Sequence, residues 1–317
     1  MKKQFIEDLH PGDDVDEVFY VLDKETRKTR DGKDFIVFNL TDRTGSLKAL
    51  FFEPGPKLMP AKGSFVRIQG KLTEYNGRLN IKIEDMWQEK ESGIDYSDFL
   101  PKSERDVEKC YSGLKRAALE LREPLRALLS AFFDNPSFER QFKLAPAGVR
   151  AHHAYIGGLC LHTYDMLVLA EAVAASDSEL DSQLLTAGVL LHDIGKIREY
   201  EYSKSIDNTD EGKLLGHIAI GIRMIEREIL RIQGFPEKLA WKLLHMVVSH
   251  HGFKEYGSPR PPLFLEAQIL HQIDNLDSKR AMYREVAERR GEGNWSEYHP
   301  YLEHDTYLDR SESERGA

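Results

Sequence analysis

The chain has 317 residues, of which 41% are hydrophobic and 31% are charged, and its formal net charge is −9 at pH 7. This length accommodates two domains with separate hydrophobic cores, and the composition is that of an ordinary soluble protein. The sequence contains no apolar run that approaches the ~20 residues needed to span a bilayer, and its N-terminal MKKQFIEDLH lacks the apolar segment of a secretory signal.

Residues 13–88 have the pattern of short β-strands. Five segments alternate apolar with polar residues and are rich in Val, Ile, Phe and Tyr. Between two such segments, Asn76-Gly77 is a strong hairpin signal because both turn residues must take positive φ. Five strands in this length predict a small closed barrel of the OB type, and the stretch GSFVRIQGKLTEYNGRLNIKI resembles the last hairpin of nucleic-acid-binding OB-folds. We therefore assign residues 1–90 to an N-terminal OB-fold domain that binds nucleic acid.

The charge of this domain is compatible with a nucleic-acid partner. Residues 1–90 contain 16 Lys and Arg and 16 Asp and Glu, so the net charge of −9 arises in the remainder of the chain. A neutral domain can present a basic face, and single-strand binders combine such a face with aromatic rings on which bases stack. Phe38 alternates with Ile36 and Leu40, so we expect it in the barrel core rather than at this face. The candidates for base stacking are Phe52 and Tyr75, and those for phosphate contacts are Lys48, Lys71 and Arg78.

The rest of the chain predicts an all-α domain. Residues 91–102 interrupt the strand pattern and form the expected linker, and Ser103 followed by Asp106 suits the start of a helix. Apolar residues then recur at three- and four-residue spacing as far as residue 290. Residues 203–212 are polar and predict a loop or short hairpin, and residues 291–317 predict an extension that folds back on the domain before a disordered end. The expected helices are 103–121, 124–133, 136–143, 154–175, 181–195, 216–233, 236–250 and 263–290.

The chain has only two cysteines, Cys110 and Cys160. This number is too small for a disulfide framework, and both cysteines lie in the region predicted to be helical. We therefore expect a reducing, cytoplasmic environment.

His192 and Asp193, in the string LLHDIGK, are the centre of a candidate metal site. Together they offer an imidazole nitrogen and a carboxylate to one cation, and a carboxylate can bridge two cations. Other His and Asp residues lie in apolar helical segments, where a buried polar side chain needs a partner. A helical bundle can bring together ligands that are more than 100 residues apart in sequence. These further candidates are His162, His217, His250, His251 and Asp274.

The order of these residues resembles a known family. His162, His192-Asp193 and Asp274 follow the H…HD…D order of the HD-domain metal-dependent phosphohydrolases. The strings HHAYIGGLCLHT, LLHDIGK, EGKLLGHIAIG, SHHG and DNLDSK resemble those of the YhaM-type 3′→5′ exoribonucleases, in which an OB-fold precedes the HD domain. The resemblance covers nearly the full chain. It implies that residues 103–290 are an HD domain and that the protein degrades single-stranded RNA from its 3′ end to nucleoside monophosphates, with single-stranded DNA left open as a substrate.

Two divalent ions are expected in this site. Two ions suit phosphodiester hydrolysis because they lower the pKa of a water and neutralise charge on the reacting oxygens. Imidazole donors favour Mn²⁺, Co²⁺, Ni²⁺ or Fe over Mg²⁺, and Mn²⁺ is the expected ion. His250 and His251 can bind one ion only where their helix ends, and Gly252 is compatible with such an end. The expected ligands are His162, His192, Asp193 and Asp274 for the first ion, and His217, His250 and His251 with bridging Asp193 for the second.

Four other residues near the ligands have candidate roles toward the substrate or the ions. Lys196 would stabilise charge on the substrate phosphate beside the catalytic Asp193; the alternative is an exposed lysine at a helix C-terminus. His152 and His153, in the loop before the His162 helix, would face the substrate phosphate or else have a structural role. Asp277, three residues after Asp274, is either a substitute ligand or an outer partner.

His271 precedes Asp274 by three residues. It is expected to be a core histidine or an outer partner of the ligands.

Two other functions stay open at this point. One is an HD phosphohydrolase that acts on a small nucleotide or cyclic dinucleotide, with a regulatory barrel. The other is a catalytically inactive nucleic-acid-binding adaptor. The complete set of ligand residues argues against the adaptor, because an inactive site usually lacks some of them.

Overall fold

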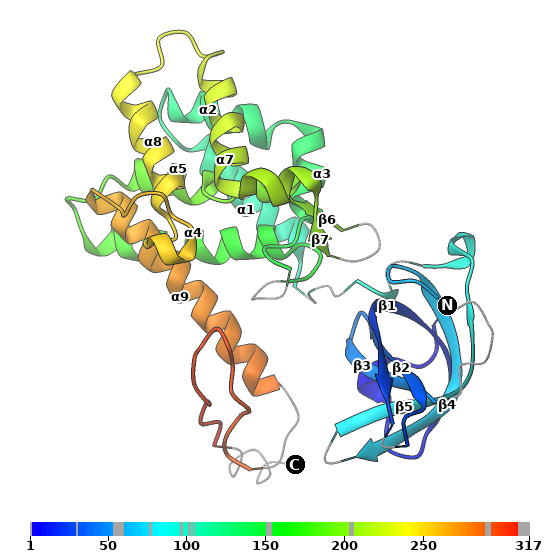
Figure 1. Cartoon of the computed structure of the whole chain (residues 1–317). Helices are drawn as coiled ribbons and strands as arrows, with labels where there is room; N and C mark the ends of the chain where they lie inside the picture. The colour runs from blue at the N-terminus through cyan, green and yellow to red at the C-terminus, as the bar shows by residue number, and fades with distance from the viewer. Residues whose placement is uncertain are drawn as a thin grey trace. The chain divides into compact units, whose positions relative to one another are not determined.

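The structure, a computed structural model, divides into two compact units (Figure 1). The barrel unit contains residues 1–102 and 202–206, and the helical unit contains residues 103–201 and 207–317. For Tyr75, Arg78 and Tyr256 the structure describes the backbone but not the side chain. The described residues are 2–29, 31–52, 60–75, 78–95, 98–100, 103, 105–149, 154–202, 206–288 and 293–309.

The barrel unit is a closed five-stranded β-barrel, which confirms the predicted OB-type architecture. β1 pairs antiparallel with both β2 and β4. The antiparallel pairs β2–β3 and β4–β5 continue the sheet, and the parallel pair β3–β5 closes it. The strands are β1 (Asp14–Lys28), β2 (Asp34–Asp42), β3 (Gly45–Phe51), β4 (Phe65–Tyr75) and β5 (Arg78–Gln88).

Alternation of apolar and polar residues places one face of each strand inside the barrel. Phe38, which the sequence pattern predicted in the core, has no exposed surface. The register between β4 and β5 shifts at Gln69/Gly70. A Cβ on Gly70 would lie 2.3 Å from the carbonyl oxygen of Lys82, so only glycine permits the two strands to approach this closely.

Residues at both ends of the barrel segment pack against it. The Lys2 ammonium is buried, donates to the Val18 carbonyl at 2.6 Å and lies 3.4 Å from Asp42 Oδ2. The Phe99 ring contacts the edge of Phe65 at a centroid distance of 4.8 Å. The segment predicted as a linker, 91–102, therefore includes a residue that packs on the barrel. Figure 1 shows the strands of this unit.

Short polar side chains determine where several helices of the helical unit begin. Asp106 accepts a hydrogen bond from the backbone of Lys109 at the start of α1. Asn135, Asp181 and Thr209 cap α3, α5 and α7 in the same way. The helices are α1 (Val107–Leu119), α2 (Leu125–Phe133), α3 (Pro136–Leu144), α4 (Gly158–Ser176), α5 (Ser182–Leu191), α6 (Lys196–Glu199), α7 (Asp210–Ile229), α8 (Glu237–Ser249) and α9 (Leu265–Glu288).

Several helix boundaries differ from the prediction. The first helix starts at Val107 rather than at residue 103, because Asp106 is the capping residue. The expected helix 181–195 is divided into α5 and α6 by a turn that holds the His-Asp pair. The expected helix 216–233 begins six residues earlier, at Asp210, and contains a non-helical residue at Gly216.

The polar segment between α6 and α7 includes the short hairpin that was one of its two expected forms. β6 (Tyr200–Glu201) pairs antiparallel with β7 (Asp207–Asn208). Residues 203–205 of this segment lie outside the described residues.

α4 is the most apolar long helix of the helical unit. By length and composition alone it is the one helix in the described part of the chain that could span a membrane, with a mean hydropathy of 1.3. His162, Asp165 and Glu171 interrupt the apolar residues of this helix, so the sequence has no continuous apolar run here. Half of this window is buried, and α4 contacts α1, α5 and α9. This helix therefore forms part of the core that surrounds the candidate site.

Residues 293–309 fold back onto α9, as the sequence pattern predicted. Leu302 packs against Met282 and Val286. The Lys279 ammonium donates a hydrogen bond to the Tyr301 carbonyl at 2.9 Å.

Candidate metal centre

The His and Asp residues singled out in the sequence meet inside the helical unit. They come from three helices, α4, α7 and α9, and from the turns that follow α5 and α8, so segments more than 100 residues apart in sequence contribute to one site. Among the described residues these side chains form two groups, and within each group the ligand atoms all lie within 4.8 Å of one another. The groups are His162, His192 and Asp193, and His217, His250 and His251.

The first group is almost completely buried. His192 Nε2 lies 3.2 Å from Asp193 Oδ2 and 3.3 Å from His162 Nε2. Asp274 joins this group, with its Oδ1 3.4 Å from His162 Nε2. Ligand atoms that each lie about 2.1 Å from one ion are roughly 3–3.4 Å apart. The spacing of these donors therefore fits a single divalent cation.

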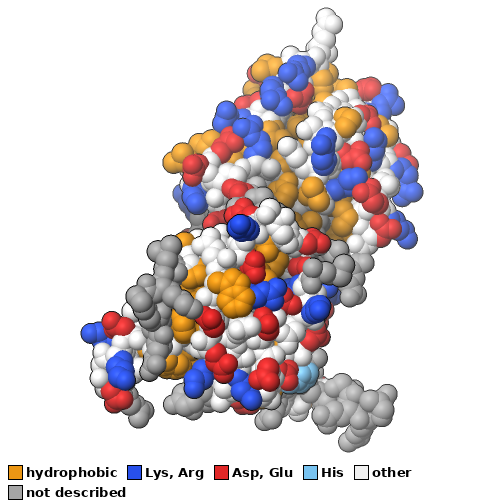
Figure 2. Space-filling model, turned by 90° about the vertical axis from the view of Figure 1, so that its right-hand side faces the viewer, with side chains coloured by type: hydrophobic (Ala, Val, Ile, Leu, Met, Phe, Trp, Pro, Cys, Tyr) orange, Lys and Arg blue, Asp and Glu red, His pale blue; other side chains and the backbone are white. Residues whose placement is uncertain are grey.

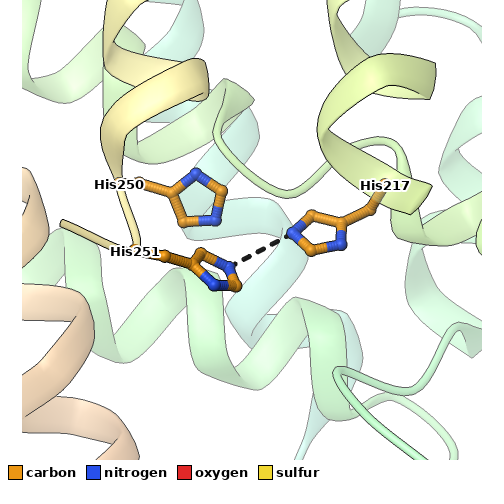
Figure 3. A group of neighbouring side chains, drawn as sticks. All are labelled: His217, His250 and His251. Carbon is orange, nitrogen blue, oxygen red and sulfur yellow. Dashed lines mark hydrogen bonds between the residues drawn. The ribbon is translucent and has the colours of Figure 1, made fainter. Parts of the chain in front are cut away.

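The second group consists of three imidazoles from two segments (Figure 3). His217 Nε2 lies 3.3 Å from His251 Nε2. α8 ends at Ser249, and Gly252 has φ +80, so the chain leaves the helix at the two histidines. This end explains how the consecutive residues His250 and His251 can face one centre.

Asp193 lies between the two groups. Its Oδ2 faces His192, whereas its Oδ1 lies 3.5 Å from His217 Nε2 and 3.6 Å from His250 Nε2. Among the described residues, Asp193 Oδ1 and His250 Nε2 are buried without a hydrogen-bond partner. A buried polar atom that lacks a partner is costly, and a cation would satisfy both atoms. The residues therefore fit two divalent cations with Asp193 as the bridge.

Helix ends orient two of the imidazoles. His192 Nδ1 donates to the Val189 carbonyl at 2.8 Å, and His250 Nδ1 donates to the Val247 carbonyl at 2.7 Å. The last carbonyls of a helix have no partner within the helix, so they are available as acceptors here. A carbonyl only accepts, so each Nδ1 carries a hydrogen. Each neutral ring then presents its Nε2 lone pair to the centre.

Two carboxylates outside the groups orient two further imidazoles, those of His162 and His217. Asp277 Oδ2 accepts from His162 Nδ1 at 2.8 Å, so Asp277 has the position of an outer partner. Glu199 has the same relation to His217, because its Oε2 lies 3.2 Å from His217 Nδ1. Glu199 was not predicted from the sequence, because a glutamate in the string KIRE has the pattern of a solvated helix face.

His271 lies behind the second group and supports the turn that carries it. Its Nδ1 donates to the His250 carbonyl at 2.8 Å. A Cβ on Gly252 would lie 2.3 Å from the His271 ring, so the turn packs directly on this imidazole. His271 therefore supports the turn that carries His250 and His251 from outside the ligand group, as one of its two expected roles required.

The charges of the centre depend on burial and on the neighbouring groups. Burial lowers the pKa of His162, but Asp274 and Asp277 raise it more, to about 10. Burial raises the pKa of Asp193, but Lys196 and His192 hold it well below the usual range. Burial and the neighbouring His251 lower the pKa of His250. At neutral pH Asp193 is thus ionised and His250 is neutral, whereas a cation must displace a proton from His162.

Lys196 is part of the centre. Its side chain is buried, and its ammonium donates to Asp193 Oδ2 at 2.6 Å. The alternative of an exposed lysine is therefore wrong. His152 and His153, the candidates for a phosphate contact, lie outside the described residues.

The candidates for nucleic-acid binding on the barrel differ in their surroundings. Phe52 is 39% exposed, and its ring stacks on Phe35 at a centroid distance of 5.1 Å. Lys48 is exposed, and Lys71 Nζ lies 3.8 Å from Asp14. The side chains of Tyr75 and Arg78 lie outside the description. On the face drawn in Figure 2, the coloured Lys and Arg side chains are interspersed with Asp and Glu.

Two parts of the chain match known family models. Residues 161–279 match the HD domain, and this match includes every ligand candidate of the centre. Residues 21–88 match the tRNA anti-codon family, described as an OB-fold nucleic acid binding domain. Together with the His/Asp cluster, these matches indicate a metal-dependent phosphohydrolase that binds nucleic acid.

The chain is also similar to solved structures. One is the second OB-fold domain of replication protein A from Methanococcus maripaludis, with 19% identity over 30% of this chain and all of that chain, at a TM-score of 0.24. Another is the p204 HINb domain, with 19% identity over 27% of this chain and a TM-score of 0.24. The match spans 46% of that second chain.

Proposed function

We propose that the protein is a divalent-metal-dependent 3′→5′ exoribonuclease that hydrolyses single-stranded RNA to nucleoside monophosphates. The helical unit carries the hydrolytic centre, and the barrel binds the strand. RNA as the substrate and the 3′→5′ direction rest on the resemblance to the YhaM-type enzymes. The phosphodiester chemistry is supported by the centre itself.

The position of Asp193 is the observation that carries this proposal. Its two oxygens face different imidazole groups, and Oδ1 has no hydrogen-bond partner among the described residues. A single carboxylate between two histidine groups is suited to a pair of ions. When bound, such a pair would supply Lewis acidity toward the phosphodiester and lower the pKa of a water.

The residues of the chain would give this centre an open side and a fixed positive charge. The side chains of Asp274 and His217 are 16% and 13% exposed, whereas those of His162 and His192 are 1% and 0% exposed. A substrate phosphate would therefore approach past Asp274 and His217. The Lys196 ammonium, held against Asp193, would offset negative charge at the phosphate.

The donor set favours a transition metal for both groups. Five imidazoles and two carboxylates are available, whereas Mg²⁺ prefers shells made only of oxygen. Mn²⁺ is the ion that we expect to support turnover, with Co²⁺, Ni²⁺ and Fe²⁺ as alternatives. Neither cysteine belongs to the two groups, in contrast to most structural zinc sites.

The barrel would hold a single strand by stacking and by phosphate contacts. Phe52 exposes one part of its ring while Phe35 supports another, so the ring is a rigid surface for a base. Lys48 lies on β3, which ends at Phe51, and its exposed ammonium would contact a phosphate of the strand. Single-stranded DNA presents the same bases and phosphates, so it belongs in the test.

The test is a product ladder. The purified protein is incubated with Mn²⁺ and 5′-end-labelled single-stranded RNA, single-stranded DNA or small nucleotides, and Asp193→Asn is the matched control. Products that shorten stepwise from the 3′ end in the parent but not in the variant support the proposal. Turnover of small nucleotides alone would instead favour a phosphohydrolase with a regulatory barrel. Strand binding without any product would refute the hydrolytic function and favour an adaptor.

A further inference from the structure

α7 contains a break that determines the position of His217. Gly216 has φ 70 and ψ 159, so the helix stops there and resumes at the histidine. The first N–H groups of a resumed helix lack acceptors within that helix. Glu199 Oε1 accepts from the His217 backbone nitrogen at 3.0 Å, and therefore supplies one of these acceptors from the end of α6.

The same carboxylate faces the imidazole of His217. Nδ1 of the ring lies 3.3 Å from Glu199 Oε1 and 3.2 Å from Oε2. An ionised carboxylate only accepts, so Nδ1 carries the hydrogen and Nε2 presents its lone pair. This Nε2 lies 3.3 Å from His251 Nε2 and 3.5 Å from Asp193 Oδ1, and Figure 3 shows His217 turned toward His251.

Two glycines hold the backbone around this contact. A Cβ on Gly212 would lie 2.2 Å from the Glu199 carbonyl oxygen. A Cβ on Gly195 would lie 2.0 Å from the His217 carbonyl oxygen. The backbone of α7 is thus packed closely against Gly195 and against Glu199, which leaves the Glu199 carboxylate and the ring of His217 little freedom to separate.

We propose that Glu199 is a positioning residue for the second ion. It fixes the tautomer and the direction of His217, and it thereby raises the affinity of the His217–His250–His251 group for a divalent cation. Asp277 has the same relation to His162 in the first group. The inference rests on the proposed two-ion centre, but it concerns ion affinity and not the identity of the substrate.

The test compares Glu199→Gln with the parent by calorimetric titration of the metal-free protein with Mn²⁺. Glutamine keeps the size of the side chain but lacks the charge. Loss of an outer carboxylate typically weakens a metal site ~10–100-fold. We expect Glu199→Gln to bind one ion like the parent and the other ~10–100-fold more weakly. Electron paramagnetic resonance should then show the hyperfine lines of isolated Mn²⁺ in place of a spin-coupled pair.

Glu211→Gln is the matched control. Glu211 lies on α7, as His217 does, and pairs with Arg198 and Arg223 rather than with an imidazole. We expect it to bind both ions like the parent. Thermal unfolding of each metal-free variant monitors the fold.

A double-mutant cycle keeps the proposal testable if Glu199→Gln is less stable. When His217→Gln already removes the ligand, the additional change Glu199→Gln should not weaken Mn²⁺ binding further. Equal, additive losses in the two backgrounds would overturn the positioning role, as would a Glu199→Gln variant that binds both ions like the parent. A parent protein that binds two ions but degrades no RNA would refute the proposed function and leave this inference intact.

Discussion

Gly195→Ala is the substitution that most directly tests the contact between α6 and α7. Gly195 has φ −63 and ψ −23, so alanine meets no backbone strain at this position. The added Cβ would nevertheless lie 2.0 Å from the His217 carbonyl oxygen and 2.8 Å from the Gly221 nitrogen. Cβ atoms essentially never come within 3.0 Å of such neighbours. The two backbones must therefore separate by about 1 Å, because no rotation of a side chain relieves a clash between backbone atoms.

The size of the effect follows from this overlap. Overpacking of a closely packed interior typically costs about 1–3 kcal/mol of unfolding free energy. The shift also moves His217, which lies 3.5 Å from Asp193 Oδ1. We expect Gly195→Ala to be ~1–3 kcal/mol less stable in chemical denaturation and to lose affinity for the second Mn²⁺ ion in a calorimetric titration.

Gly221→Ala is the control for this prediction. A Cβ at Gly221 would have its nearest neighbours at 3.5–3.9 Å, which is ordinary contact. Alanine is favoured over glycine inside a helix by about 0.8–1 kcal/mol, so this variant should be as stable as the parent or more stable. If Gly195→Ala matched Gly221→Ala in both stability and ion affinity, the close approach would not constrain the centre and the reasoning would be wrong.

Three further substitutions test other parts of the molecule. Asp193→Asn should abolish Mn²⁺-dependent hydrolysis, because the bridging charge is lost, and should leave strand binding by the barrel near the parent value in a fluorescence titration with RNA. Phe52→Ala should weaken binding of single-stranded RNA ~5–160-fold, given about 1–3 kcal/mol per stacked base; unchanged affinity would exclude this ring as a platform. Burial raises the pKa of Glu17, but backbone N–H groups of Lys3, Val18 and Gln4, together with the Lys2 ammonium, bring it below its usual value near 4.5. A carboxyl group whose pKa is lowered by folding stabilises the protein at pH values above its usual pKa. The loss of stability in Glu17→Gln, measured by thermal unfolding, should therefore be largest above pH 4.5. It should shrink as the pH falls through the lowered pKa of Glu17.

The barrel was predictable because local signals agree with the tertiary fold. Strand alternation and turn residues are encoded within a few positions of each other, and the fully buried Phe38 follows from its alternation with Ile36 and Leu40. The support of the Phe52 ring by another aromatic residue could not be predicted in the same way. It depends on the stacking partner Phe35, which is brought near by strand pairing.

The helix boundaries show where local patterns are insufficient. Residues 210–215 lack helical apolar spacing, so the sequence pattern placed the start of the helix at residue 216, where the structure has a break inside α7. The break is stabilised by Glu199, from a segment 18 residues away, whose carboxylate accepts from the resumed helix. The same long-range contact explains why this outer partner of His217 was not found from spacing.

The residues of the centre were predictable because their chemistry is unusual for apolar helices. Imidazoles and carboxylates such as His162 and Asp274 are seldom buried without partners, so their types pointed to a shared cation. The resemblance then supplied the grouping. The division of the two oxygens of Asp193 between the imidazole groups required the structure, since the adjacent His192 and Asp193 could equally have served one ion.

The positions of the consecutive ligands share one physical cause. Side chains of adjacent helical residues diverge by ~100°, so a pair of neighbouring ligands is difficult to accommodate within a helix. Both adjacent pairs follow a helix end, at Leu191 for His192 and Asp193, and at Ser249 for His250 and His251. The same ends provide the free carbonyls of Val189 and Val247, which orient the first imidazole of each pair. Helix termini therefore determine both the direction and the tautomer of these ligands. A change that extended α8 through residue 252 would turn the side chains of His250 and His251 in different directions without altering either residue.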